Sequence, residues 1–526
     1  MENTVTSLAP VPSARLADTQ PSATRRDSLI RSTSSSSSGT HSELVLSEKH
    51  MKPSDIHQIK ITEDSTSERD ITASKEALEA LEDAHPLPCK TSPRMIRCLR
   101  WGVFSVYRRL FTLVFTLNLV ACILVLVQLR HQGSSIATYT NASTAAGANI
   151  CVAVLMRNEH VVNVLFRIVC CVPHSAPLWF RRRLAKVYSY GGVHSGCGVA
   201  ATFWYIAYCG LMIHNFTRGG SVDIGLVVTT GVVLFLLVLI LVFAHPYLRM
   251  RFHDHFERIH RFAGWTAVAA LWAQAMLSVS SKSQLDGVSF GHALIRIPNF
   301  WFLIVITCCL VYPWARLRRR SVEAEPLSKH AIRLHFDYRE MESCAGVRFT
   351  DSALKETHAF ATIPNTAHEK RGHSIVIANA GDWTNKIIQN PPKQIWTRGA
   401  PTLGVMRVAL CFKKVLVIGT GSGIGPCLSF LQSNPGYPVQ VIWSAPNPVQ
   451  NYGPKIMDAV LRADSKAVIV DTKRTGRGNL LALAYALFQE SGAEATVIIS
   501  NPAVTRKVVY GLENRGVPAF GAIFDS

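Results

Sequence analysis

Long apolar stretches dominate the middle of the chain, between residues 101 and 320. Six of them approach the length that an α-helix needs to cross a membrane, which is about 20 residues. They cover residues 107–129, 149–172, 187–213, 223–245, 261–280 and 297–315. The second is interrupted by Arg157-Asn158-Glu159-His160, which we interpret either as a structural ion pair or as part of a substrate site. The pattern predicts a polytopic α-helical membrane domain of six spans over residues 96–320.

The segments on either side of these stretches have a different character. Residues 1–95 are polar and rich in Ser, and such a segment is expected to be a disordered tail because it buries too little apolar area to offset its ordering entropy. Arg25-Arg26-Asp27-Ser28 within it is either a kinase site or a chance match. Residues 321–412 alternate short apolar runs with turns, which predicts a small β-barrel. Residues 413–526 repeat strand and helix patterns, which predicts an α/β doubly wound domain with a parallel sheet.

The distribution of charged residues along the sequence distinguishes a membrane protein from a soluble nucleic-acid-binding protein. The chain is 48% hydrophobic yet has a formal charge of +20, and the Lys and Arg residues collect beside the apolar stretches. With the N-terminus inside, the cytosolic flanks hold sixteen of them and the outer loops four, as the positive-inside rule requires. The glycosylation sequons at Asn141 and Asn215 both fall in predicted outer loops. We therefore expect a glycoprotein of the lipid bilayer, in the plasma membrane, with both termini cytosolic and no nucleic-acid partner.

The most specific local motif begins at residue 415, where a buried strand leads into a glycine-rich turn and a helix. Backbone N–H groups at such a helix N-terminus can hold a diphosphate, because no side chains shield them. The residues expected to do so are Gly419, Thr420, Gly421, Gly423, Gly425 and Pro426. The alternative is a tight glycine turn in some other α/β domain.

Three further segments and the glycine motif together resemble the ferredoxin-reductase-like module of ferric reductases and NADPH oxidases. The first segment is HAFAT (358–362), which resembles the HPF(S/T) segment lying against the flavin; the second is AGDWT (380–384), which resembles the turn that meets the FAD pyrophosphate. GAPTLG (399–404) resembles the element that precedes the nicotinamide domain. The resemblance implies FAD and NAD(P)H as cofactors. The FAD contacts that it implies are His358, Phe360, Ala361, Thr362, Gly381, Trp383 and Thr384.

The same resemblance implies roles near the C-terminus. Ser500-Asn501-Pro502 stands where the family has Cys-Gly-Pro, so Ser500 takes the catalytic position and Asn501 and Pro502 contact the cofactor. Phe524 is implied as the terminal aromatic that stacks on the flavin. Ser444 lies where a 2′-phosphate is often bound, but the Ser-x-Arg pattern is absent, so NADH and NADPH stay open. The basic run at residues 473–477 is either a substitute anion site or a solvated loop.

Ferric-reductase domains ligate haem with paired His residues on the third and fifth spans. Here His194 and His260 occupy the inner pair, whereas the outer positions, thirteen and fourteen residues further on, hold Ala207 and Tyr208 on one span and Ala273 and Gln274 on the other. The resemblance therefore implies at most one haem b, with iron bound by His194 and His260. The alternative is that no haem is bound and that these side chains cap helices or bind phosphate.

As a whole, the chain after residue 95 is similar to the fungal TmpA-type integral membrane proteins, and similar halves follow adenylate-forming enzymes. This implies a membrane-bound flavin-dependent oxidoreductase that passes electrons from NAD(P)H through FAD to an unknown acceptor, in fungal development or redox signalling. The alternative is a non-catalytic signalling protein that keeps the reductase fold as a nucleotide or redox sensor. A transporter is a third reading, although no inverted repeat is visible.

Overall fold

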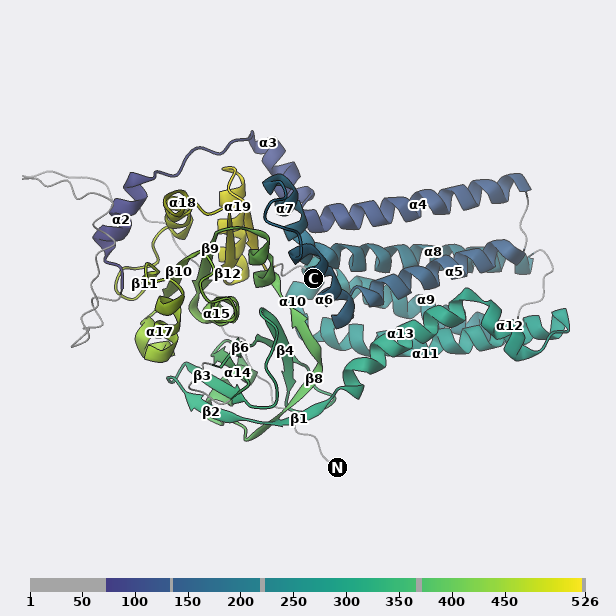
Figure 1. Cartoon of the computed structure of the whole chain (residues 1–526). Coiled ribbons are helices and arrows are strands. Elements are labelled where there is room, and N and C mark those ends of the chain that lie inside the picture. Colours follow the sequence, from purple (N-terminus) through teal and green to yellow (C-terminus); the bar gives the residue numbers. More distant parts are fainter. Residues whose placement is uncertain (1–71, 133–135, 218–222, 366–370, 523–526) are drawn as a thin grey trace, which may run out of the picture. The chain divides into compact units, whose positions relative to one another are not determined.

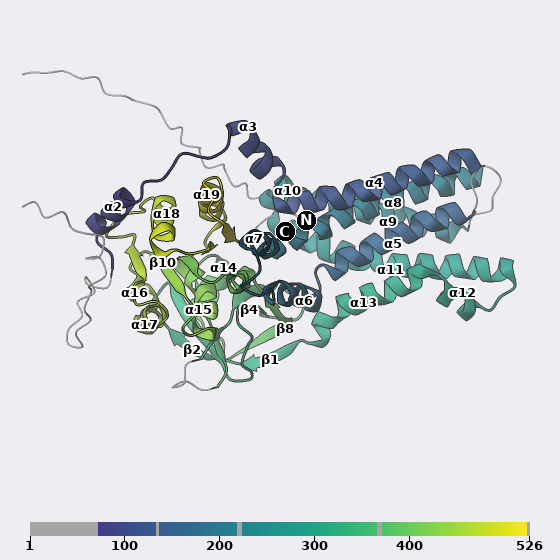
Figure 2. The ribbon, with the colours of Figure 1, turned by 45° about the horizontal axis from the view of Figure 1, so that its top comes forward.

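The computed structural model describes residues 72–522, apart from residues 133–135, 218–222 and 366–370. All described residues belong to one compact unit. Its first half contains six long helices that lie side by side in two views (Figures 1 and 2). They are α4 (Val106–Gln132), α5 (Ile136–Leu155), α8 (Gly191–Thr217), α9 (Ile224–Ala244), α11 (His253–Asp286) and α13 (Pro298–Ala315). Shorter elements flank them: α3 (Arg94–Arg97), the π-helical η2 (Cys98–Val103), α6 (Glu159–Cys170), α7 (Leu178–Leu184), η3 (Ala185–Tyr190), α10 (Pro246–Arg251) and α12 (Phe290–Arg296).

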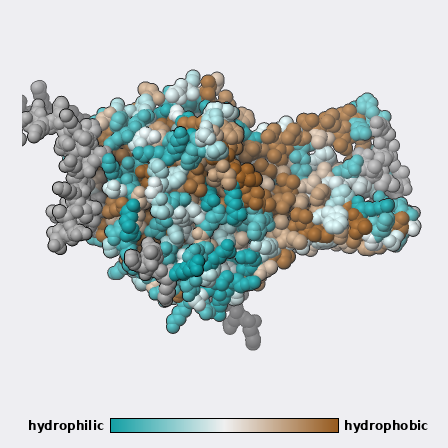
Figure 3. Space-filling view, in the orientation of Figure 1, coloured by the Kyte–Doolittle hydropathy of each residue, from teal (hydrophilic) through white to brown (hydrophobic). Residues whose placement is uncertain are grey.

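Among the described residues, five helical segments are long and apolar enough to cross a membrane. They correspond to the first, third, fourth, fifth and sixth predicted spans. Large apolar side chains cover their outer faces, and Leu124 and Phe235 are 62% and 65% exposed. The helical bundle accordingly shows a largely hydrophobic side surface (Figure 3). Because water does not favour so much exposed apolar surface, these helices suit a lipid environment.

The second predicted span, residues 149–172, is wrong in its boundaries. The chain forms two helices there, and α5 begins earlier, at Ile136. Asn158 separates them, because its side chain accepts hydrogen bonds from the N–H groups of His160 and Val161 and so caps α6. The longer of the two is α5, with 20 residues, many of them small or hydroxyl-bearing, and it is not among the five segments above.

The two sequons do not lie in loops as predicted. Asn141 lies within α5 and Asn215 lies in the last turn of α8, so the helices extend further than their apolar cores. Both are at the same end of the bundle, where α5 begins and α8 ends. Glycosylation at these positions stays a prediction.

Two four-stranded antiparallel sheets follow the bundle. One has the order β1-β8-β4-β5 and the other β2-β3-β7-β6. The strands are β1 (Arg318–Ser321), β2 (Glu323–Pro326), β3 (Ala331–Phe336), β4 (Ala345–Thr350), β5 (His358–Ala361), β6 (Ile363–Pro364), β7 (His373–Ala378) and β8 (Gln394–Leu403), with α14 (Asp382–Gln389) between β7 and β8. Phe336, Phe349 and Ile375 share a fully buried core. The predicted change from helical to alternating periodicity after residue 320 thus marks a β-structure.

His373 makes this antiparallel core sensitive to acid. Its ring is fully buried and stacked on Phe336 with centroids 5.2 Å apart, and burial lowers its pKa to about 4. The unfolded chain takes up this proton near pH 6.5. Stability is therefore retained above pH 6.5 and is lost as the pH falls towards 4, by about 2 kcal/mol at pH 5. Melting curves at pH 7 and pH 5 should show a smaller difference for His373→Asn than for the native chain. The exposed His330→Asn is the control, and an equal change in both variants would contradict the assignment.

The C-terminal part is built on a five-stranded parallel sheet with the order β11-β10-β9-β12-β13. Its strands are β9 (Val415–Thr420), β10 (Val439–Ala445), β11 (Val468–Asp471), β12 (Ala495–Ile499) and β13 (Ala519–Gly521). The helical elements are η4 (Val405–Cys411), η5 (Gly421–Gly423), α15 (Ile424–Ser433), α16 (Pro448–Tyr452), α17 (Pro454–Ala463), α18 (Leu480–Ser491) and α19 (Pro502–Glu513). Val415 and Val417 face one hydrophobic core, and Leu416 and Ile418 face another. Both faces of the sheet are covered, as predicted for a doubly wound domain.

Part of the predicted disordered tail is ordered. Residues 1–71 lie outside the described residues, but α2 (Lys75–Ala84) follows them, and Ser74 caps it by accepting from the N–H of Ala77. Leu81 is 5% exposed and packs in the core beside α18. The Ala73 N–H donates to Ile469 O at 2.9 Å. The boundary at residue 95 therefore fails, because the segment gains its order from the parallel-sheet domain rather than from its own composition.

Helix α6 joins the bundle to the β-structure. Glu159 is 3% exposed and binds Arg348 of β4 at 2.5 Å. Asn163 donates to Pro401 O at 2.9 Å and accepts from the N–H of Leu403 at 2.8 Å, so its amide holds β8 from both directions. The interruption in the second apolar stretch is thus explained as a structural ion pair, the first of its two predicted interpretations.

Candidate functional site

The glycine turn between β9 and α15 has a shape that only glycine permits. Gly421 has φ +51°, in the left-handed region that side chains disfavour. A Cβ on Gly423 would lie 2.3 Å from Ile499 O, far inside van der Waals contact. The Trp443 indole N–H donates to Gly421 O at 3.1 Å and holds the turn from β10. The turn is therefore fixed on both sides, by β10 and by β12.

Helix α15 begins directly after this turn and has no side-chain cap. The first N–H groups of a helix have no acceptor inside it, and together with the helix dipole they form an anion site. Pro426 has no N–H, so the available donors come from the residues around it. The motif predicted from sequence thus lies at an uncapped helix N-terminus, and diphosphate binding there stays a prediction.

Three predicted residues meet at the carboxyl edge of the parallel sheet. Thr420 ends β9 and is paired in register with Ser444 of β10. Ser500 follows β12, and its Oγ lies 2.6 Å from Thr420 Oγ1. The strand order reverses between β9 and β12, and ligands of open α/β sheets bind at such a switch point. Asn501 caps α19 by accepting from the N–H of Val504, and Pro502 is the first residue of that helix.

A second group of predicted residues forms an aromatic cluster. His358 of β5 stacks on Trp383 of α14, with ring centroids 4.2 Å apart and planes at 22°. Phe360 lies 5.8 Å from the same indole. His358 Nε2 is buried and has no hydrogen-bond partner among the described residues. These rings offer flat surfaces of the kind that a planar cofactor ring requires.

Asp351 was not predicted and holds the cluster in place. Its carboxylate accepts from the Trp383 indole N–H at 2.9 Å and from Lys386 Nζ at 2.7 Å. Burial alone would raise the pKa of Asp351, but these two hydrogen bonds lower it below its usual value. Nothing in the spacing of the sequence connects this residue to α14, because it lies on a different segment.

The remaining predicted FAD contacts within the described residues lie either at the start of α14 or at the end of β5. Thr384 Oγ1 accepts from the N–H groups of Ala380 and Gly381, which shapes the start of α14, and the space beside Gly381 is open. Thr362 is 2% exposed and its hydroxyl donates to Ala345 O, so it supports the sheet and does not face a ligand. Ala361 ends β5, beside Gly346 of β4. Phe524 lies outside the described residues.

The glycine turn and the aromatic cluster belong to adjacent elements. Helix α15 packs against β5 and β6, and η5 contacts β7. Ile424 and Cys427 of α15 share a buried core with Ile363 of β6 and Val376 of β7. A ligand on the glycine turn and a ligand on the aromatic cluster would therefore be neighbours.

The two predicted haem ligands are brought together inside the bundle. The rings of His194 and His260 have centroids 6.3 Å apart. Two imidazoles on opposite sides of one iron have centroids about 6 Å apart, because each nitrogen lies about 2 Å from the metal. His194 Nδ1 is hydrogen-bonded to Ala153 O at 2.8 Å, which leaves Nε2 for a ligand. The pair fits one metal-centred group. The outer positions do not, because Gln274 Nε2 lies 3.4 Å from the Tyr208 hydroxyl.

Comparisons with known proteins agree with part of this picture. Residues 405–526 match the family model described as "Adenylate-forming reductase 03009, C-terminal domain". The chain is 41% identical over 445 residues to adenylate-forming reductase 03009 of Coprinopsis cinerea, covering 85% of this chain and 42% of that protein. It is 40% identical over 447 residues to adenylate-forming reductase 06235 of the same organism, with the same coverage.

Solved structures give weaker matches. A ferredoxin NADP+ reductase from Neisseria gonorrhoeae with bound FAD and NADP has a TM-score of 0.33 and 13% identity, over 40% of this chain and 99% of that one. The ferredoxin reductase of carbazole 1,9a-dioxygenase has a TM-score of 0.32 and 16% identity, over 40% and 70%. The chain spans less than half the length of the curated relatives that it matches. Over most of its own length, it is a homologue of these fungal adenylate-forming reductases.

Proposed function

We propose that this chain is a membrane-bound, NAD(P)H-dependent flavin oxidoreductase. The observation that carries the proposal is the packing of the glycine turn, at the switch point of the parallel sheet, against the strands beside the His358–Trp383 stack. The homology to proteins named reductases supports it. Bound FAD would supply the conversion between the two-electron chemistry of a nicotinamide and one-electron steps.

The residues of the chain would share the work of binding and orientation. The turn Gly421–Gly423 and the first amides of α15 would hold the diphosphate of the nicotinamide nucleotide. Ser500, fixed by its hydrogen bond to Thr420, would position the nicotinamide ring. His358, Phe360 and Trp383 would contact the flavin, and the N-terminus of α14 would face its diphosphate. The carboxylate of Asp382 lies in the first turn of α14 and would repel this diphosphate.

The test is the spectrum of the full chain purified in detergent or nanodiscs and supplied with FAD. We expect a flavin absorbance that NADH or NADPH bleaches without oxygen. Trp383→Leu should weaken flavin binding at least about fivefold, because a stacked aromatic contributes about 1 kcal/mol beyond the area it buries. Tyr485→Leu, on α18, is the matched aromatic control and should retain flavin. Protein that binds no flavin under any loading condition would sink the proposal.

A nucleotide or redox sensor is the competing proposal. It is favoured by Ser500, which replaces the Cys of the family and whose hydroxyl is already bonded to Thr420. A sensor would bind NAD(P)H and FAD but would not turn over with an artificial electron acceptor, whereas the oxidoreductase would.

We further propose that His194 and His260 hold one haem, which would supply a one-electron site inside the bundle. The separation of their rings supports this. The same purified protein should then show a Soret band that His194→Ala removes. A band that survives this substitution would rule out the assignment.

A further inference from the structure

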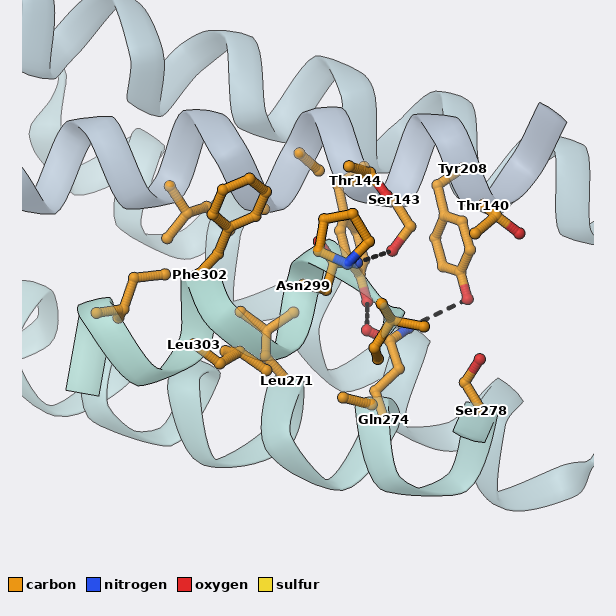
Figure 4. A pocket seen from close by; sticks show the side chains of 18 of the residues that line it. Thr140, Ser143, Thr144, Tyr208, Leu271, Gln274, Ser278, Asn299, Phe302 and Leu303 are labelled. Atoms are coloured by element: carbon orange, nitrogen blue, oxygen red, sulfur yellow. Dashed lines mark hydrogen bonds between the residues drawn. The ribbon is translucent and has the colours of Figure 1, made fainter. Parts of the chain in front are cut away.

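All thirteen cysteines of the chain carry free thiols. Six of them lie on the long helices of the bundle, at positions 122, 151, 197, 209, 308 and 309. The cavity between α5, α8, α11 and α13 is lined by hydroxyl, amide and apolar side chains, and no cysteine lines it in the described part of the chain (Figure 4). A small polar molecule in this cavity would therefore not meet a thiol.

Two thiols do meet at the junction between α6 and the parallel-sheet domain. Cys170 is the last residue of α6, and Cys411 is the last residue of η4. Although 241 residues separate them along the chain, their Sγ atoms lie 3.9 Å apart. Helix α6 packs against η4, so this contact is part of the surface that joins the bundle to the parallel-sheet domain.

The two thiols differ in their access to solvent. Cys411 is 1% exposed and belongs to the hydrophobic core. Cys170 lies at the edge of the same core and is only partly buried, and its Sγ donates to Arg407 O at 3.4 Å. A small molecule from solvent therefore reaches Cys170 first, whereas Cys411 is shielded except on the side where it contacts Cys170.

The two thiols also differ in how easily they ionise. The hydrogen bond from Cys411 lowers the pKa of Cys170, and the positive charge of Arg407 lowers it as well, although burial opposes both. The pKa of Cys411 is raised, first by the hydrogen bond that it donates and then by burial. Because the thiolate is the nucleophile, Cys170 is the sulfur of this pair that is suited to attack an oxidant.

We propose that Cys170 and Cys411 are a peroxide-sensitive pair that closes a reversible disulfide between α6 and η4. The Cys170 thiolate attacks hydrogen peroxide, so that an S–O bond forms, the O–O bond breaks, and the hydroxide leaves with the thiol proton as water. The Cys411 sulfur then attacks the sulfenic sulfur, so that the S–S bond forms, the S–O bond breaks, and a second water leaves with the Cys411 proton. The two thiols lose two electrons, and one peroxide is reduced to two waters.

The position of the pair makes this bond both feasible and consequential. A disulfide needs its sulfurs about 2 Å apart, so these two must approach each other by roughly 2 Å. Cys170 ends its helix, and a terminal turn can supply such a movement. η4 leads directly into β9 and the glycine turn, so the bond would restrain the segment that precedes them. Outside oxidising compartments, disulfides are usually transient and redox-sensing. The inference does not depend on flavin or nicotinamide binding, because neither cysteine belongs to those sites.

The experiment uses the full chain in nanodiscs, reduced and then separated from the reductant. Equimolar hydrogen peroxide is added, catalase ends the reaction, and N-ethylmaleimide blocks the remaining thiols before proteolysis and mass spectrometry without reduction. We expect a cross-linked peptide pair that contains Cys170 and Cys411 and that dithiothreitol separates. Cys171 is exposed but is not the thiol that contacts Cys411, so it should remain free.

Three variants identify the roles of the two sulfurs. Cys411→Ala should abolish the cross-link and raise the sulfenic acid at Cys170, trapped with dimedone, at least about tenfold, because no second thiol removes it. Cys170→Ser should lose both the cross-link and the adduct, and it keeps the test decisive if Cys411→Ala does not fold. Cys171→Ser is the matched control and should cross-link like the native chain.

Three results for the native chain would overturn the proposal. One is a disulfide that joins Cys170 or Cys411 mainly to another cysteine. Another is oxidation of Cys170 to the sulfinic acid without a cross-link, which would show that Cys411 does not reach it. The third is a Cys170 that equimolar peroxide leaves unoxidised, which would show that the contact is only part of the packing.

Discussion

Replacing Gly423 with alanine is expected to lower NAD(P)H-dependent reduction at least about 100-fold. The added Cβ would lie 2.3 Å from Ile499 O, and Ile499 is held in place by the pairing of β12 with β9. The turn would have to move away from β12 by roughly 1 Å, and a shift of that size in a positioning element can cost about 100-fold in rate. Because the turn would hold the nucleotide directly, the loss should also appear as weaker nucleotide binding.

The matched control is Gly478→Ala. Gly478 follows β11, its φ is not in the left-handed region, and a Cβ there meets no atom within 4 Å. Titration of nucleotide against both variants, with melting temperatures to exclude global unfolding, separates a local effect from a general one. Native affinity in a folded Gly423→Ala protein would show that the nucleotide does not use this turn.

The glycine turn could be predicted from sequence because its conformation depends on residues that are neighbours along the chain. The segment combines a buried strand, four glycines within seven residues and an amphipathic helix that follows them. These features constrain the backbone whatever surrounds them. What could not be predicted is the partnership of Thr420 with Ser500, because it depends on β12 pairing with β9 across eighty residues. Asp351, likewise, reaches Trp383 only once β4 and α14 are packed together.

The errors in the helical half also have a physical cause. Hydropathy locates the apolar part of a helix, but α5 and α8 continue through polar residues that the rest of the bundle satisfies, such as Asn149, whose amide donates to Asn118. The boundary of α5 was missed because the apolar residues of α6 that follow it serve a different purpose: Val162 and Phe166 are buried against η4 and the parallel-sheet domain. Composition alone does not distinguish burial in lipid from burial in protein.

Replacing Arg181 with methionine is expected to destabilise the chain by about 1–3 kcal/mol, because the partly buried Glu494 carboxylate and two backbone carbonyls lose their donor. Arg181 of α7 is 3% exposed and binds both carboxylate oxygens of Glu494, at 2.7 and 3.1 Å. The same guanidinium donates to Ala176 O and Cys411 O, and Glu494 also accepts from the N–H of Lys413. The residue therefore ties the helical half to the loops that precede β9 and β12.

Thermal unfolding of the solubilised chain, followed by tryptophan fluorescence, measures this effect. Arg371→Met is the matched control, because the Arg371–Glu340 pair is 88% and 60% exposed and should contribute less than about 1 kcal/mol. The double variant Arg181→Met with Glu494→Met should be more stable than Arg181→Met alone, since it leaves no uncompensated buried charge. If Arg181→Met has the same melting temperature as the control, apolar packing along α6 and η4 holds the two halves together, and the ion pair contributes little to stability.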